Sequence, residues 1–145
     1  MQNNAKEYNT FPKPLSKMKT CIICIGSNHN PSSNITKAVE TLSTLFPDIL
    51  WGETVVTPAE GVSVPVPDYH NRAAVFTTSM GISQLKHRFK EMEKACGRGS
   101  DSKSTGIVPL DIDLLQYDGE ILKPRDMQMG YVRKALEDII LPNND

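Results

Sequence analysis

The sequence predicts an α+β fold, and three observations carry this prediction. Four short segments are either apolar throughout or alternate apolar and polar residues, which is typical of β-strands. Two longer segments repeat apolar residues every three or four positions, which is typical of amphipathic helices. Along the chain these segments follow the order strand, helix, strand, strand, helix, strand. This order predicts the split β-α-β, or ferredoxin-like, arrangement, an antiparallel sheet with helices packed on one face.

The N-terminal half supplies the first strand, the first helix and the second strand. The apolar run at residues 20–25 predicts a strand, and the turn residues that follow it end the strand. Residues 35–45 carry a helical apolar stripe, which Ser33 or Asn34 can cap. The second strand is expected at residues 49–56.

The C-terminal half supplies the remaining elements. Residues 69–78 alternate as a third strand, and a helix is expected at residues 85–96, with Gly97 ending it in a left-handed conformation. Residues 98–106 contain no apolar anchor, so we expect a mobile polar loop there. The fourth strand lies within residues 106–119.

The size and charge of the chain limit the classes of function. Its 145 residues are enough for one domain with a hydrophobic core. The formal net charge of -1 gives no reason to expect a nucleic acid or an anionic membrane as a partner. No apolar run approaches the roughly 18 residues of a membrane span, and the N-terminus has no hydrophobic signal core. We therefore expect a soluble, cytoplasmic protein.

The N-terminal residues differ in composition from the rest of the chain. Residues 1–18 are polar, are interrupted by Pro12 and Pro14, and show no periodicity. This pattern predicts a flexible tail followed by a single domain at residues 19–145. Met18 is an alternative to Met1 as the natural start.

The three cysteines are interpreted as thiols rather than as a disulfide framework. Their number is odd, and Cys21 and Cys24 share the first strand, where they fall on opposite faces. This pattern favours small buried residues of a reducing compartment; a redox pair or half of a zinc site is the alternative.

Two acidic residues interrupt the apolar pattern of the fourth strand. In the run 110–114, Asp111 and Asp113 alternate with apolar residues, so they share one face, about 7 Å apart at Cα. Neighbouring carboxylates repel each other, and a divalent cation such as Mg²⁺ removes this conflict because it prefers oxygen ligands. The alternative is an edge strand with a polar outer face.

Five short motifs lie at the ends of the predicted elements. They are Ile-Gly-Ser-Asn, Thr-Pro, Asp-Tyr-x-Asn-x-Ala, Glu-x-x-x-Gly-Arg and Leu-Asp-Ile-Asp-Leu, at residues 25–28, 57–58, 68–73, 93–98 and 110–114. Their order and spacing resemble those of the 6-hydroxymethyl-7,8-dihydropterin pyrophosphokinase family of folate biosynthesis. The resemblance implies transfer of diphosphate from ATP, the co-substrate, to 6-hydroxymethyl-7,8-dihydropterin, with release of AMP. It also implies two Mg²⁺ ions.

The resemblance further implies roles for individual residues. Asp111 and Asp113 would ligate the metals and, with Arg98, form the catalytic group. The residues that would hold the pterin are Thr57, Pro58, Tyr69, Asn71 and Tyr131. Glu93, Arg98 and Ile112 would hold the nucleotide by the same resemblance. Lys103, Arg125 and Arg133 match no family residue and are further candidates for nucleotide binding because they are nearby cations.

Four of these residues have alternative interpretations. Asn71 offers a donor and an acceptor that suit the mixed edge of a pterin ring, but it can also be simple polarity at a strand start. Tyr69 can be a half-buried aromatic residue. Arg98 either binds phosphate or places a favourable charge at a helix C-terminus. Glu93 is either a supporting acid or part of a solvated helix face.

The chain departs from the family pattern in the loop before the acidic strand. Family members carry further arginines and a Trp-Gly-Pro-Arg sequence there. Here Thr105 takes the tryptophan position, Val108 takes the arginine position, and Lys103 is the loop's remaining cation. The family's later histidine and arginine lack clear counterparts, and the last element is a short amphipathic helix at residues 131–140. We therefore expect a shortened member with a divergent phosphate-binding loop.

Two hypotheses of different classes follow. The first is an active pyrophosphokinase, slowed by its divergent loop. The second is a catalytically weakened relative that binds pterin or nucleotide in an accessory role. An RNA-binding module is disfavoured because the net charge is -1 and no strand carries the paired surface aromatics that stack bases. The expected partners are small molecules, and an oligomer is not required.

Overall fold

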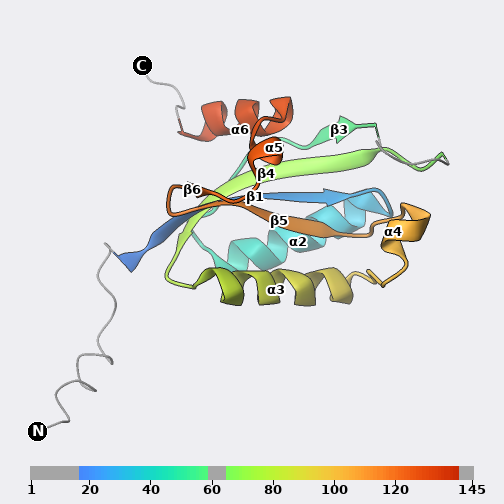
Figure 1. Cartoon of the computed structure of the whole chain (residues 1–145), viewed down its shortest axis with the longest axis horizontal. Coiled ribbons are helices and arrows are strands. Elements are labelled where there is room, and N and C mark those ends of the chain that lie inside the picture. Colours follow the sequence, from blue (N-terminus) through green and yellow to red (C-terminus); the bar gives the residue numbers. More distant parts are fainter. Residues whose placement is uncertain (1–16, 59–64, 141–145) are drawn as a thin grey trace, which may run out of the picture.

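The computed structural model describes residues 17–58 and 65–140 (Figure 1). The tail predicted at residues 1–18 therefore lies almost entirely outside the described residues. Within the described part, the fold is an antiparallel sheet flanked by helices, and the predicted α+β class is confirmed. The strands are β1 (Lys19–Ser27), β2 (Leu50–Trp51), β3 (Val55–Thr57), β4 (Tyr69–Thr78), β5 (Asp111–Tyr117) and β6 (Glu120–Ile121). The helices are α2 (Pro31–Leu45), α3 (Ile82–Ala95), α4 (Ser102–Thr105), α5 (Pro124–Met127) and α6 (Gly130–Ile140).

The sheet has the strand order expected of a ferredoxin-like fold. Its order is β2-β4-β1-β5-β6, and β3 pairs with β4 beside β2. The predicted second strand is thus two short strands that share one neighbour. The interruption falls at Gly52, where an added Cβ would lie 2.5 Å from the Cβ of Ala135 on α6. Close packing of α6 against the backbone therefore coincides with the break in this strand.

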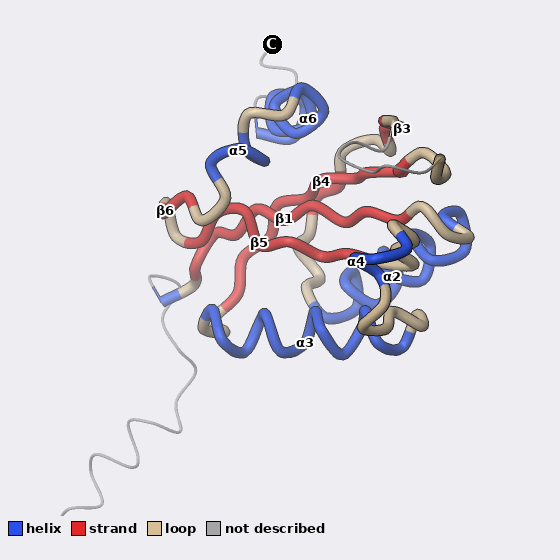
Figure 2. Tube along the Cα trace, turned by 45° about the vertical axis from the view of Figure 1, so that its right-hand side comes forward, coloured by secondary structure: helices blue, strands red, loops and turns tan. Residues whose placement is uncertain are grey.

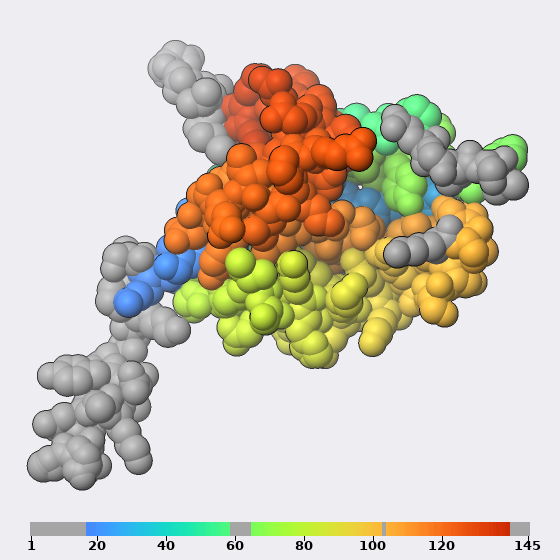
Figure 3. All heavy atoms as spheres, viewed as in Figure 1, coloured from blue at the N-terminus to red at the C-terminus, as the bar shows by residue number. Residues whose placement is uncertain are grey.

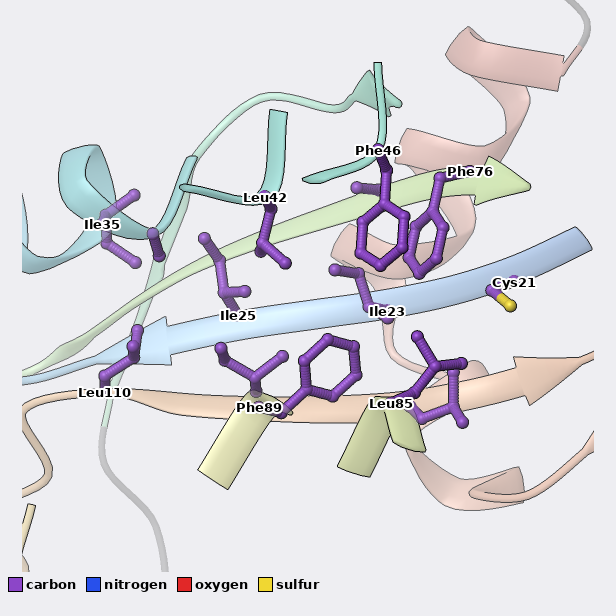
Figure 4. Packing of buried hydrophobic residues seen from close by; sticks show 14 residues of the cluster. Cys21, Ile23, Ile25, Ile35, Leu42, Phe46, Phe76, Leu85, Phe89 and Leu110 are labelled. Atoms are coloured by element: carbon purple, nitrogen blue, oxygen red, sulfur yellow. The ribbon is translucent and has the colours of Figure 1, made fainter. Parts of the chain in front are cut away.

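The first face of the sheet is covered by α2 and α3, and it carries the main hydrophobic core (Figures 1 and 2). Alternate residues of β1, including Ile23 and Ile25, point into this core because successive side chains of a strand point to opposite faces. Phe46 and Phe76 stack there with ring centroids 4.0 Å apart (Figure 4). The single-face packing predicted for the two long helices is confirmed.

The second face carries a smaller apolar cluster beneath α6. Ile22, Cys24, Leu115 and Val132 are buried together there. The sequence predicted helices on one face only, and this is corrected here because α5 and α6 also lie over part of the second face (Figure 2). In the space-filling view the segment from β6 to α6 lies above the strands and α3 lies below them (Figure 3).

The cysteines are free thiols on both faces of the sheet. Cys21 belongs to the core under α2 and α3, and Cys24 to the cluster under α6, so the predicted opposite placement is confirmed. Burial raises the pKa of each of these two thiols to about 12. Neither thiol is therefore ionised at neutral pH, which disfavours the redox alternative.

Candidate active site

The acidic pair lies at the start of β5, on the second face of the sheet. Asp111 and Asp113 pair in register with Gly26 and Cys24 of β1. The apolar residues between and beside them, Leu110, Ile112 and Leu114, are buried. The predicted alternation is therefore observed: hydrophobic burial of one face of β5 holds both carboxylates on the other.

A row of paired residues crosses four strands beside these carboxylates. Val55 pairs with Asn71, Asn71 with Gly26, and Gly26 with Asp111. A Cβ at Gly26 would lie 3.4 Å from Asn71 Oδ1 and 3.7 Å from Tyr69 Cδ1. Because Gly26 has no side chain, it leaves space between the amide of Asn71 and the acidic pair. Residues from distant parts of the sequence meet around this space.

The buried amide of Asn71 fixes the edge of this row. Its Nδ2 group donates to Thr57 Oγ1 at 2.9 Å and to the carbonyl oxygen of Val55 at 3.2 Å. Both amide hydrogens are thus used inside the protein, and the Oδ1 acceptor lies over Gly26. Tyr69 pairs with Thr57 in the next position and is half-buried. Burial and the nearby charge of Asp111 raise the pKa of Tyr69.

Each carboxylate of the acidic pair contacts one cationic side chain. Asp111 Oδ1 lies 2.7 Å from Arg98 Nη1, and Asp113 Oδ1 lies 3.2 Å from Lys123 Nζ. Burial and the neighbouring Asp111 raise the pKa of Asp113 to about 7. Burial also opposes ionisation of Asp111, but hydrogen bonds from Asp113 and Arg98 outweigh it and lower the pKa of Asp111. The pair therefore retains about one proton below neutral pH.

Glu93 and Arg98 hold the outer edge of β5 in place of a neighbouring strand. Glu93 Oε2 accepts a hydrogen bond from the backbone N–H of Ile112 at 2.8 Å. Arg98 Nη1 donates to the carbonyl oxygen of Leu110 at 3.2 Å and lies 3.4 Å from Glu93 Oε1. Glu93 is buried, which raises its pKa and contradicts the alternative of a solvated helix face. These contacts position the strand that carries both carboxylates.

The end of α3 directs Arg98 toward β5. Gly97 has a φ of 95°, and the backbone N–H groups of Gly97 and Arg98 donate to the carbonyl oxygens of Lys94 and Glu93. This is the Schellman arrangement, in which a left-handed residue reverses the chain after a helix. The predicted end of the helix at Gly97 is confirmed.

The segment before β5 is more ordered than the sequence suggested. Residues 102–105 form the helical turn α4, with Ser102 buried, which corrects the expectation of a loop without anchors. Asn28, itself buried, donates from Nδ2 to the carbonyl oxygen of Gly106 at 2.8 Å and accepts at Oδ1 from the N–H of Val108. Val108 is buried as well. The valine at the position of the family arginine is therefore packed in the protein and supplies no charge.

The remaining predicted site residues are placed less closely around the carboxylates. The side chain of Ile112 is buried, and Pro58 is exposed beside Thr57. The hydroxyl of Tyr131 lies 3.9 Å from Cys24 Sγ, and its ring packs against the cluster under α6. Burial raises the pKa of Tyr131. Two further residues, Arg125 and Arg133, are exposed on α5 and α6.

Lys103 lies in α4, but its side chain is outside what the structure describes. Among the described residues, no ion pair involves Arg125 or Arg133. The nucleotide-binding roles predicted for these three basic residues therefore remain predictions.

A pocket of about 460 Å³ opens along the outer edge of β5. Three lysines line it together with the acidic pair, and all three were missed by the sequence reasoning: Lys86, Lys90 and Lys123. The first two lie seven and three residues before Glu93 on α3, so their shared helix face was a usable signal. Lys123 carried no such signal, because only the β5–β6 hairpin brings it beside Asp113.

The donor set at this site fits Mg²⁺. The two carboxylates supply hard oxygen ligands, and each already has a cationic group at contact distance that stands in for a metal. Within the described residues, no cluster of three or more His, Cys, Asp or Glu side chains is arranged to hold a metal ion. Asp111 and Asp113 would therefore share the ion with oxygens of a bound phosphate group, as is usual for Mg²⁺.

Fold and site together define a ferredoxin-like α+β domain with a paired-carboxylate site among cationic side chains. The sequence matches the model of the 7,8-dihydro-6-hydroxymethylpterin-pyrophosphokinase family over residues 22–141. The chain therefore belongs to this family of diphosphokinases, and the resemblance seen in its motifs is confirmed.

Other comparisons add little. A search of curated proteins found no significant match. Among solved structures, one similar chain is the Bacillus subtilis YXEP protein, described as a dinuclear metal-binding peptidase of the M20 family. It is 12% identical, with a TM-score of 0.30, and the match covers 72% of this chain but only 26% of that one. This likeness supports no conclusion about function. None of the described helices combines the length and hydropathy needed to cross a membrane.

Proposed function

We propose that this protein transfers the diphosphate group of ATP to 6-hydroxymethyl-7,8-dihydropterin and releases AMP. The observation that carries the proposal is the row joining Asn71, Gly26 and Asp111 across adjacent strands. A flat heterocycle beside Asn71 would lie next to a polyphosphate held at the acidic pair. Family membership supports the same reaction class.

The pterin would bind at the end of the row formed by β3 and β4. Asn71 Oδ1, over Gly26, offers an acceptor to a ring N–H group, and the half-buried ring of Tyr69 offers an apolar surface. Thr57 positions Asn71 through the hydrogen bond to its Nδ2 group. An amide locked in this way binds without losing further side-chain entropy, which favours affinity.

The polyphosphate would bind at the end of the row formed by β5. Asp111 and Asp113 would hold Mg²⁺, which would supply positive charge to stabilise the negative charge that develops on the phosphates. Arg98 fixes the position of Asp111, and Glu93 fixes β5 itself. In the proposed reaction the hydroxymethyl oxygen forms a bond to the β-phosphorus, its proton is released, and AMP leaves as the α–β bridge breaks.

The test is AMP formation from ATP and Mg²⁺, with and without 6-hydroxymethyl-7,8-dihydropterin. We expect AMP only when the pterin is present. Asp111→Asn and Asp113→Asn should each lower the rate at least ~100-fold, because metal stabilisation of developing charge contributes several kcal/mol. Asp118→Asn is the matched control, since Asp118 lies in the same hairpin, is exposed, and pairs with Lys19 instead. Pterin-independent AMP formation, or full activity in both site variants, would contradict the proposal.

The second hypothesis, a relative that binds without efficient transfer, has one observation in its favour. Val108 is buried where family members place a loop arginine, so this position supplies no cation to the phosphates. Isothermal calorimetry measures ligand binding. Both functions predict binding of the pterin and of a non-reactive ATP analogue with Mg²⁺, so the AMP assay with ATP decides: a binding protein would bind both ligands yet form no AMP from ATP over many hours.

A further inference from the structure

Of the two cations that form ion pairs with the acidic pair, Lys123 is the less constrained. It follows β6, and its backbone N–H donates to the carbonyl oxygen of Leu115 at 3.2 Å, which fixes the base of the side chain. The ammonium lies 3.2 Å from Asp113 Oδ1 and lines the pocket along β5. The side chain is 49% exposed, so it is anchored at one end and solvated at the other.

We propose that Lys123 is a phosphate-binding residue that pairs with Asp113 in the substrate-free protein and moves to the polyphosphate when the nucleotide binds. This inference rests on the proposed function, because it requires a polyphosphate in the pocket along β5. It assigns to a residue outside the recognised motifs part of the positive charge that Val108, at the position of a family arginine, does not supply.

The two ion pairs of the site differ in how easily they break. The guanidinium of Arg98 is 28% exposed, and the Nη1 atom that contacts Asp111 also donates to the carbonyl oxygen of Leu110. It also lies close to Glu93. Lys123 has Asp113 as its only carboxylate partner among the described residues. Solvated lysine pairs are weak, so Lys123 can leave Asp113 at little cost while Arg98 stays.

The arrival of substrate changes the electrostatic preference of Lys123. A divalent cation at Asp113 binds the carboxylate more strongly than an ammonium does and repels the ammonium at short range. The oxygens of the polyphosphate then become the nearest excess of negative charge. Since these oxygens must lie close to Asp113 for a metal to bridge them, they fall within reach of the four-carbon side chain of Lys123.

The need for such a cation follows from the surrounding sequence. In the segment before β5, Val108 is buried, and the side chain of Lys103 lies outside what the structure describes. Lys86 and Lys90 line the same pocket from α3, which faces the outer edge of β5. Lys123 approaches the acidic pair from the other direction, at the start of α5. Among the described residues that line the pocket, it is therefore the cation placed to contact a phosphate from the side opposite α3.

The experiment measures two binding affinities of a Lys123 variant, for a metal ion and for a nucleotide analogue. The inference predicts that they change in opposite directions. Lys123→Met should bind Mn²⁺ alone about three- to tenfold more tightly, by electron paramagnetic resonance, because the competing ammonium is gone. The same variant should bind Mg²⁺ with α,β-methylene-ATP about tenfold more weakly, by calorimetry, because a charge-assisted contact is lost. Binding of adenosine should not change. Lys123→Arg keeps a cation and should recover most of the analogue affinity.

Lys134→Met is the matched control, because Lys134 is exposed and pairs with Asp138 on α6. This variant changes the net charge by the same amount as Lys123→Met, and it should alter neither the affinity for Mn²⁺ nor the affinity for the ATP analogue. If Lys123→Met binds the analogue as well as or better than the wild type, Lys123 is only a counter-ion of Asp113 and the inference is overturned. If the wild type itself fails to bind the analogue with Mg²⁺, the proposed function fails together with the inference, so the two failures are distinguishable.

Discussion

At the scale of single residues, the site is built from polar groups that the interior holds in fixed positions. The buried amides of Asn28 and Asn71 use their hydrogen bonds to join segments that are distant in sequence, and buried Glu93 does the same for β5. Among the described residues, no buried side-chain nitrogen or oxygen lacks a partner. The unresolved conflict is electrostatic: two carboxylates share one strand face, and one retains its proton near neutral pH.

The first prediction concerns this conflict in the metal-free protein. The folded state raises the pKa of Asp113 from 3.8 to about 7, so it holds the proton more tightly than the unfolded state does. The free energy of unfolding must then fall as pH rises from about 4 to about 7. Asp113→Asn removes this decrease in the free energy of unfolding with rising pH. We expect it to stabilise the protein at pH 8 by about 1–2 kcal/mol, less than the full shift implies because Asp113 is partly exposed to solvent and the lowered pKa of Asp111 acts in the opposite direction.

The measurement is thermal unfolding at pH 4, 6 and 8 in buffers containing a chelator. The variant should match the wild type near pH 4 and exceed it progressively above that. Asp118→Asn, on the same hairpin, should show no such trend, since no carboxylate of the site contacts it. An equal gain at every pH would show that Asp113 has no raised pKa.

At the scale of elements, the positions of short segments decide what the site contains. The hairpin between β5 and β6 turns through Asp118 and Gly119, whose φ values of 52° and 87° fit a type I′ turn. This tight turn returns the chain along β5 and places Lys123 beside Asp113. Toward the opposite edge of the sheet, α6 packs where the sequence has Gly52 between β2 and β3.

The second prediction tests how closely α6 packs on the sheet. Gly52→Ala adds a methyl group whose carbon would lie 2.5 Å from the Cβ of Ala135, and the second close atom is the Cα of the same residue. The helix must shift, so we expect a loss of about 1–3 kcal/mol in the free energy of unfolding. Urea denaturation measures it.

Gly130→Ala is the matched control, because it adds the same methyl group at the start of α6, where nothing lies within 4 Å. Since alanine favours a helix over glycine, this variant should be as stable as the wild type or slightly more stable. Equal stability of the Gly52 and Gly130 variants would mean that α6 does not press on the sheet at Gly52.

At the scale of the whole molecule, the two layers of helices leave one end of the sheet for chemistry. β1 ends there, β4 and β5 begin there, and β3 lies beside them (Figure 1). The protein has a net charge of only -1, yet cations and carboxylates gather along β5. Ligand binding at this end should therefore couple several elements at once.

The third prediction is that a metal–nucleotide complex stabilises the whole fold. Mg²⁺ with α,β-methylene-ATP at 100 times its Kd should add ~2.7 kcal/mol, which corresponds to a rise in Tm of several degrees. Mg²⁺ alone should have a much smaller effect, because the acidic pair supplies few ligands by itself. Differential scanning calorimetry with and without a chelator checks this. The same rise in the presence of chelator would show that the nucleotide binds without the metal.

The sequence alone determined the features that depend on near neighbours in the chain. The order of strands and helices, the shared face of Asp111 and Asp113, and the end of α3 at Gly97 were all predictable. Each follows from a repeat of two or 3.6 residues or from the conformational freedom of glycine, and these are local properties. The family motifs likewise lie within single segments.

Only the tertiary structure decided the features that join distant segments. It divided the second strand at Gly52, buried Val108 with its backbone N–H bonded to Asn28, covered part of the second face with α6, and brought Lys123 to Asp113. A sequence pattern records which side of its own element a residue faces, but not which other element packs there. The acidic pair could thus be found from the sequence, whereas the cations that balance it are set by long-range packing.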